Sequence, residues 1–185
     1  FAYGQTGAGK THTMMGIPGK IDGLYLLGAR DLFDKLSSMG SKTQVMASFY
    51  EIYCGRLYDL LNGRKELKAL EDGNGKIHIH GIETVQVFEP EAIMTLIEKG
   101  NRARVTGQTG ANDTSSRSHA VVQLELMEPG LPGKRGRPTA RTLNGRLSFI
   151  DLAGSERASD TKDNDKQRRM EGAEINTSLL ALKEC

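Results

Sequence analysis

Residues Gly4–Thr11 read Gly-Gln-Thr-Gly-Ala-Gly-Lys-Thr and have the spacing of a phosphate-binding loop, GxxxxGK[ST]. Its glycines allow backbone N–H groups to approach phosphate oxygens at the positive end of the helix that follows. In this pattern Lys10 neutralises the β- and γ-phosphates and the Thr11 hydroxyl binds Mg²⁺. A glycine-rich turn before a helix is the alternative. The pattern predicts a site for a nucleoside triphosphate, contacted by Gly4, Gln5, Thr6, Gly7, Ala8, Gly9, Lys10 and Thr11.

Two later segments have the residue types of a sensor for the γ-phosphate. Residues Asn112–His119 place hydroxyls, a guanidinium and an imidazole in one loop between a predicted helix and a predicted strand. Asp151 ends an apolar strand, at the sheet edge where α/β proteins bind ligands, and can hold the hydration shell of Mg²⁺. The N–H of Gly154 can reach a γ-phosphate because no side chain intervenes. Loops that gain such contacts with triphosphate and lose them with diphosphate act as switches.

The predicted elements that must position these groups alternate between helix and strand, which indicates an α/β fold with a central sheet. The helix at Leu24–Leu36 has leucines near one face, and the helix from Glu89 to about Arg104 has a buried side of Ile93, Leu96 and Ile97. Ile77–His80 alternates as a strand with its isoleucines inward and its histidines in solvent rather than on a metal. The other predicted elements are a helix at Lys10–Met15 and strands at Thr43–Tyr53, Gly55–Leu61, Ala120–Met127 and Arg146–Leu152.

Composition sets limits on the class of protein. With 185 residues, 37% hydrophobic and 26% charged, the sequence has an ordinary globular balance. Its apolar runs are too short to cross a membrane, and a net charge of +2 does not favour nucleic acid as a partner. Two cysteines make no disulfide framework, which indicates a reducing compartment. The basic loop at Pro129–Gly145 favours a solvated hairpin connection over a contact with an acidic partner.

Both ends of the sequence interrupt a predicted element. Only Phe1–Tyr3, which is typical of the end of a strand, precedes the phosphate loop. The amphipathic helix at Glu171–Cys185 has no residue that would terminate it. We therefore expect residues 1–185 to be an internal fragment of a larger catalytic domain.

In their order along the chain, GQTGAGKT, NDTSSRSH and DLAGSE resemble the phosphate loop, switch I and switch II of the kinesin motor domain. Three further segments, at Leu70–Gly73, Glu171–Asn176 and Ala181–Cys185, resemble the kinesin-13 group, and translocating kinesins generally have Ala-Leu-Gly where this chain has Lys-Glu-Cys. The resemblance implies a kinesin-type P-loop NTPase fold with a central mixed β-sheet flanked by helices on both faces. It also implies that the N-terminal strands and C-terminal helices of that domain are missing here.

The resemblance also implies roles for individual residues. Ser116 would bind Mg²⁺ with Thr11 and Asp151, and Ser115 would position the lytic water. Arg117 would pair with Glu156 when the switches close around ATP. His12 would flank the adenine; a polar residue in the first helical turn is the alternative. The implied microtubule contacts, which without the resemblance would read mainly as a solvated charged loop, are Lys162, Lys166, Arg168, Arg169, Lys183, Glu184 and Cys185.

Kinesin-13 proteins use ATP to release tubulin from microtubule ends, so the resemblance implies ATP and Mg²⁺ as cofactors and tubulin as partner. It further implies a homodimer formed outside these residues and a location on cytoplasmic microtubules, including the spindle. A translocating kinesin of another class is the main alternative, followed by a non-hydrolysing microtubule-binding module. A GTPase would need the guanine-reading Asn-Lys-x-Asp, which the sequence lacks, and Ser118-His119 fits kinesin better than myosin.

Overall fold

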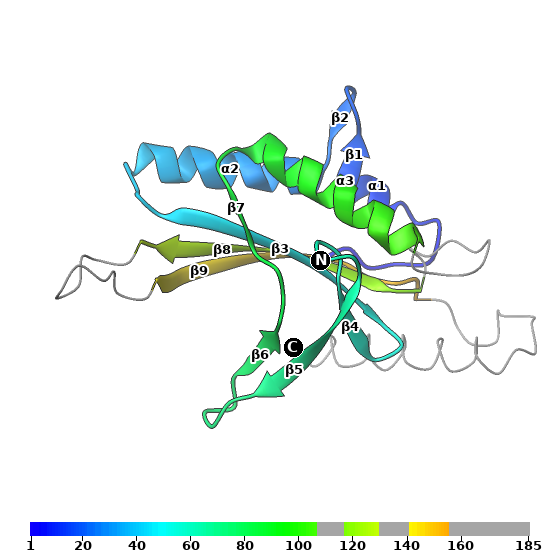
Figure 1. Cartoon of the computed structure of the whole chain (residues 1–185). Helices are drawn as coiled ribbons and strands as arrows, with labels where there is room; N and C mark the ends of the chain where they lie inside the picture. The colour runs from blue at the N-terminus through cyan, green and yellow to red at the C-terminus, as the bar shows by residue number, and fades with distance from the viewer. Residues whose placement is uncertain (107–116, 130–140, 156–185) are drawn as a thin grey trace, which may run out of the picture.

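The computed structural model describes residues 1–106, 117–129 and 141–155, which form a seven-stranded sheet with three helices against it (Figure 1). The helices are α1 (Lys10–Met15), α2 (Leu24–Ser38) and α3 (Pro90–Thr106). All three lie on one face of the sheet, and the curled strands β5 and β6 lie toward the other face. The strands of the sheet are β3 (Gln44–Tyr53), β4 (Arg56–Asp59), β5 (Lys65–Glu71), β6 (Ile77–His80), β7 (Val85–Val87), β8 (His119–Glu128) and β9 (Thr142–Asp151).

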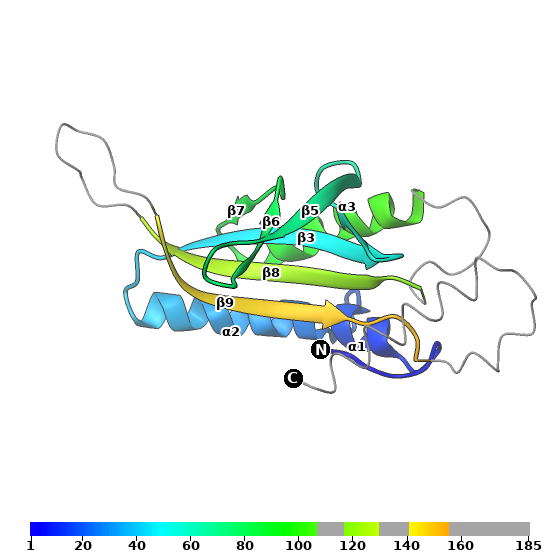
Figure 2. The ribbon, with the colours of Figure 1, turned by 90° about the horizontal axis from the view of Figure 1, so that it is seen from below.

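The order of the strands places the end of β9 at an edge of the sheet. The strands run β6-β5-β4-β3-β8-β9, with β7 beside the first half of β3 (Figure 2). Each ladder between these strands is antiparallel, and a parallel bridge joins Ala2 to Asp151, so the sheet is mixed where the chain enters the phosphate loop. The predicted strand end at Phe1–Tyr3 is confirmed by this bridge.

Alternation along β3 divides the core between the two faces of the sheet, because successive side chains point to opposite faces. Phe49 belongs to the larger cluster, in which Ile93 and Ile97 of α3 are fully buried. Tyr50 belongs to a smaller cluster with Leu67 of β5. Helix α3 approaches β3 closely at Gly100, where a Cβ would lie 2.6 Å from Phe49 Cε1. The buried side predicted for α3 is therefore confirmed.

The structure corrects one prediction of burial and shows which side of α2 packs on the sheet. The buried residues of α2 are Tyr25 and Ala29. Of the four leucines predicted near one face, Leu32 and Leu36 pack against the core, while Leu24 and Leu27 are 46% and 44% exposed. Ile77 is 66% exposed rather than inward, because β5 and β6 form a hairpin that reaches beyond the main sheet and has little to pack against at its tip.

The other elements predicted within the described residues are found with shifted boundaries, and four strands were not predicted, while the helix predicted at Glu171–Cys185 lies outside those residues. Strand β5 is made of charged and apolar residues, of which Leu67 alone is buried, so its sequence lacks the usual alternation. The break predicted after α1 contains a two-stranded ribbon, β1 (Gly16–Ile17) and β2 (Ile21–Asp22). The short β7 was also missed. Within the described residues, none of the helices is long and apolar enough to span a membrane.

Candidate functional site

The phosphate loop is attached to the end of β9 by backbone hydrogen bonds. Ala2 N–H donates to Ile150 O (2.8 Å), and Leu152 N–H donates to Ala2 O (3.2 Å). Beyond the strand, Ser155 N–H donates to Gly4 O (3.2 Å). The predicted phosphate loop and the segment after Asp151 therefore lie side by side, although they are about 150 positions apart in the sequence.

The conformation of the loop depends on its glycines. Gly7 and Gly9 have φ angles of +79° and +83°, and Gly9 precedes α1 in the left-handed conformation. A Cβ at either position would meet no atom within 4 Å, so the backbone angle rather than space favours glycine there. The loop then enters α1 at Lys10, whose ammonium donates to Gly4 O and Gln5 O at 2.9 Å each. The single cation of the motif is thus held over the loop.

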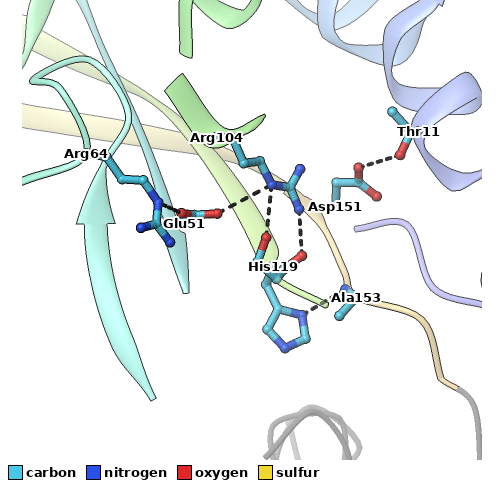
Figure 3. Close-up of polar contacts among 8 residues, drawn as sticks. Thr11, Glu51, Arg64, Arg104, His119, Asp151 and Ala153 are labelled. Atoms are coloured by element: carbon cyan, nitrogen blue, oxygen red, sulfur yellow. Dashed lines mark hydrogen bonds and ion pairs between the residues drawn. The ribbon is translucent and has the colours of Figure 1, made fainter. Parts of the chain in front are cut away.

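Thr11 and Asp151 meet at the junction of the loop with β9. Thr11 Oγ1 donates to Asp151 Oδ2 at 3.0 Å, and Asp151 is 4% exposed (Figure 3). Burial raises the pKa of the Asp151 carboxyl, and this is partly offset by the Thr11 hydrogen bond and the charges of Arg104 and Lys10. The other oxygen, Asp151 Oδ1, is buried and has no hydrogen-bond partner within the described residues. The Thr11 hydroxyl and the Asp151 carboxylate are hard oxygen ligands of the kind that divalent cations such as Mg²⁺ prefer.

No group of three or more His, Cys, Asp or Glu side chains in the described ranges could hold a metal by itself. A Mg²⁺ ion bound to nucleotide usually takes one or two protein ligands and completes its shell with phosphate oxygens and water. The Thr11 hydroxyl and the Asp151 carboxylate are therefore sufficient protein ligands for a Mg²⁺ ion that is also bound by a triphosphate. These residues fit Mg²⁺ only when the triphosphate is present.

The end of β9 is also fixed to β8 through His119. The N–H of Ala153 donates to His119 Nδ1 at 3.0 Å, and His119 is 4% exposed. Burial, with a smaller contribution from the Arg104 charge, lowers the pKa of the His119 imidazole. The neutral ring can accept at Nδ1, so the geometry and the direction of the pKa shift agree. Gly154, which follows Ala153, is buried beside the loop.

Sequence reasoning missed a set of buried charged residues next to this site. Glu51 of β3 is fully buried and pairs with Arg64, and Arg104 of α3 reaches both Glu51 and Ser118 (Figure 3). A glutamate within the apolar run Phe49–Ile52 was the available signal, because a charge inside a buried strand requires a partner.

The structure brings together part of the predicted site. The loop, Asp151 and Gly154 are adjacent, Arg117 is half-buried one residue before Ser118, and His12 is exposed on α1. The remaining predicted site residues lie outside the described ranges: Ser115, Ser116, Glu156, Lys162, Lys166, Arg168, Arg169, Lys183, Glu184 and Cys185.

Comparisons with known proteins agree with the motifs. Residues 1–185 match the kinesin motor domain family. The chain is 52% identical over its full length to kinesin-like protein KIF24 of Mus musculus and of Homo sapiens, and 51% identical to kinesin-like protein KIN-13B of Arabidopsis thaliana. It spans 13% of the KIF24 proteins and 26% of KIN-13B.

Solved structures show the same fold. A KIF14 dimer with AMP-PNP in complex with a microtubule matches with a TM-score of 0.75 and 35% identity, over 98% of this chain and 52% of that chain. The structure of a fast kinesin matches with a TM-score of 0.75 and 28% identity, over 93% of this chain and 49% of that chain. The predicted fold class, a kinesin-type fold with a mixed sheet flanked by helices, is therefore confirmed, and the helices within the described residues cover one face of that sheet.

Proposed function

The chain belongs to the kinesin motor domain family, and from this membership we propose that it binds and hydrolyses ATP with Mg²⁺ in a motor that acts on microtubules. The observation that carries the proposal is the hydrogen bond between Thr11 and Asp151. It joins the phosphate loop to the strand before switch II, where a Mg²⁺-bound γ-phosphate would have to be sensed. The solved KIF14 complex with AMP-PNP and a microtubule supports both the nucleotide and the partner.

In the proposed mechanism the phosphate loop and Lys10 bind the triphosphate. Thr11, Asp151 and Ser116 would hold Mg²⁺, which neutralises charge on the phosphate oxygens when bound. Ser115 would position the attacking water, and the Gly154 N–H would bind the γ-phosphate. Arg117 and Glu156 would close the site, and His12 would flank the adenine.

We propose further that the motor is of the kinesin-13 type and shortens microtubules from their ends. Support comes from the Lys-Glu-Cys sequence at Lys183–Cys185 and from the 51% identity to KIN-13B. The proposed tubulin contacts are the basic residues of the segment 162–169, together with Lys183, Glu184 and Cys185. Homodimerisation through other parts of the protein and a location on the microtubule cytoskeleton, including the spindle, belong to the same proposal.

We also propose that residues 1–185 are a partial motor domain that does not turn over ATP by itself. The solved kinesin chains are about twice as long as the part that this sequence covers, at 52% and 49% coverage. An isolated sheet edge and uncovered apolar surface would favour aggregation over activity. Experiments on function therefore use the full-length motor.

Steady-state ATPase assays with increasing microtubule concentration test the proposed enzymatic activity. We expect the full-length motor to hydrolyse ATP slowly alone and at least tenfold faster with saturating microtubules, because the filament would favour the closed arrangement of the switches. Phosphate release measures the rate, and microtubules without motor and motor without microtubules are the controls. An ATPase rate that does not respond to microtubules would contradict the proposed function.

A further inference from the structure

Three charged side chains from different elements meet on the side of β8 away from the phosphate loop (Figure 3). Glu51 of β3 is 0% exposed and Arg104 of α3 is 5% exposed, while Arg64 follows β4 and has a side chain that is 16% exposed. Charged side chains are rarely buried to this extent unless they are paired, because desolvation disfavours them. The burial of Glu51 and Arg104 would be explained by a specific role that requires both of their charges.

Two donors of the Arg104 guanidinium bind Ser118, one at its side chain and one at its backbone carbonyl. Its Nε donates to Ser118 Oγ at 2.9 Å, and its Nη2 donates to Ser118 O at 2.7 Å. The planar guanidinium presents these donors in a fixed fork, so the two bonds orient both the side chain and the peptide of Ser118. The contact joins the last turns of α3 to the first residue before β8.

Glu51 in turn compensates the charge of Arg104 as an ion pair. Glu51 Oε2 lies 3.5 Å from Arg104 Nε, and Glu51 Oε1 accepts from Arg64 Nε at 2.6 Å. Arg64 also lies over the ring of Tyr58, with Cζ 4.3 Å from the ring centroid. The carboxylate therefore lies between two guanidinium groups. Its Oε1 is hydrogen-bonded to Arg64, which is stacked on Tyr58, while its Oε2 makes no hydrogen bond within the described residues and meets Arg104 as an ion pair.

Ser118 lies in the chain between Arg117, the predicted switch I arginine, and His119, which is hydrogen-bonded to the segment after β9. Arg117 precedes it, and His119, which follows, accepts the N–H of Ala153 next to Gly154. We propose that Arg104 and Glu51 are a positioning pair that fixes Ser118, and through it the orientation of Arg117 and the His119–Ala153 hydrogen bond when the switches close. This inference rests on the proposed ATPase function.

The position of the pair predicts which step it affects. The hydrogen bonds of Lys10 and Thr11 at the phosphate loop are made to Gly4, Gln5 and Asp151 and involve neither residue of the pair. Nucleotide binding should therefore persist when the pair is weakened. Hydrolysis should slow, because displacement of a reacting group by about 1 Å can lower a rate by about a hundredfold.

The test compares Arg104→Lys and Ser118→Ala in the full-length motor, each of which is a smaller change than truncation of Arg104 to alanine. Arg104→Lys retains the charge next to Glu51 and loses the fork, and Ser118→Ala loses one acceptor of that fork. A single-turnover assay by rapid chemical quench measures hydrolysis without product release, and titration with a fluorescent ATP analogue measures affinity. We expect the hydrolysis rate to fall at least tenfold in Arg104→Lys and about threefold in Ser118→Ala, with affinity within about twofold of wild type.

Arg56→Ala is the matched control. It removes an arginine from an exposed ion pair with Glu66, at 3.6 Å and with side chains 63% and 56% exposed, so hydrolysis should be unchanged. Glu51→Gln combined with Arg104→Lys should cost less than the product of the two single effects, because both would act through Ser118.

Each outcome decides the inference. A wild-type rate in Arg104→Lys, in a motor that hydrolyses ATP, would overturn the positioning role and leave the proposed function intact. A parallel loss of affinity and rate would assign the pair to general stability and overturn it as well. If Arg104→Lys does not fold, Ser118→Ala alone decides by the same criterion. A wild-type motor that hydrolyses no ATP would overturn both proposals together.

Discussion

Lys10→Ala is expected to remove measurable ATP binding from the full-length motor. Lys10 is the only cation of the phosphate loop, and its ammonium lies within 2.9 Å of two carbonyl oxygens of that loop, which places it where the β- and γ-phosphates would bind. Hydrogen bonds to charged groups contribute about 1.5–3 kcal/mol each. Loss of two such bonds should weaken binding by more than a hundredfold. Fluorescence titration with a labelled nucleotide measures the change.

Lys20→Ala is the control for the loss of one positive charge near the site. Lys20 is exposed in the turn between β1 and β2 and is not part of the phosphate loop. Its removal should leave affinity unchanged, so a selective effect of Lys10→Ala would not be a result of net charge. Equal affinity of Lys10→Ala and wild type would show that the assignment of the loop is wrong.

Glu156→Ala should lower microtubule-stimulated ATP turnover by more than a hundredfold while nucleotide still binds. The chain enters Glu156 directly from Ser155, whose N–H donates to Gly4 O at 3.2 Å, so switch II begins beside the phosphate loop. On the other side, Arg117 adjoins Ser118, which Arg104 holds. Removing one charge from a closed, dry pair costs about 3–5 kcal/mol, and each 1.36 kcal/mol changes a rate tenfold. Steady-state phosphate release with saturating microtubules measures turnover.

Two further variants separate the pairing of Arg117 and Glu156 from other effects. Arg117→Ala should give a similar loss, and the double variant should be little worse than either single variant, because both remove the same interaction. Glu66→Ala, which removes an exposed carboxylate from the pair with Arg56, should leave turnover unchanged. Near-normal turnover in Glu156→Ala would mean that this pair does not close the site.

Residues of the candidate site could be predicted from the sequence where a local chemical requirement determines which residue type is needed. Positive φ angles before a helix require glycine, a phosphate requires a cation, and Mg²⁺ requires hard oxygen ligands. The loop and Asp151 could therefore be identified from their sequence and their places after strands. The hydrogen bond between Thr11 and Asp151, across 140 positions, shows that the two residues lie side by side.

The residues that sequence reasoning missed depend on tertiary contacts. Glu51 and Arg104 are stable inside the protein only because each meets a partner from another element, and neither partner is visible in local periodicity. Likewise, β5 is held by its neighbours β4 and β6 rather than by an apolar face. Ile77 was placed inward because alternation cannot indicate how far a hairpin extends beyond its sheet.

The central claim is that the ATP cycle of this motor removes tubulin from microtubule ends. Microscopy of immobilised, stabilised microtubules with the full-length motor and ATP tests it most directly. We expect shortening from both ends with ATP. Shortening should be lost in the double variant Lys183→Ala with Glu184→Ala, which should still bind nucleotide because neither residue belongs to the phosphate loop or to the Thr11–Asp151 pair. Directed gliding of microtubules without shortening of their ends would contradict the account and assign the chain to a translocating kinesin.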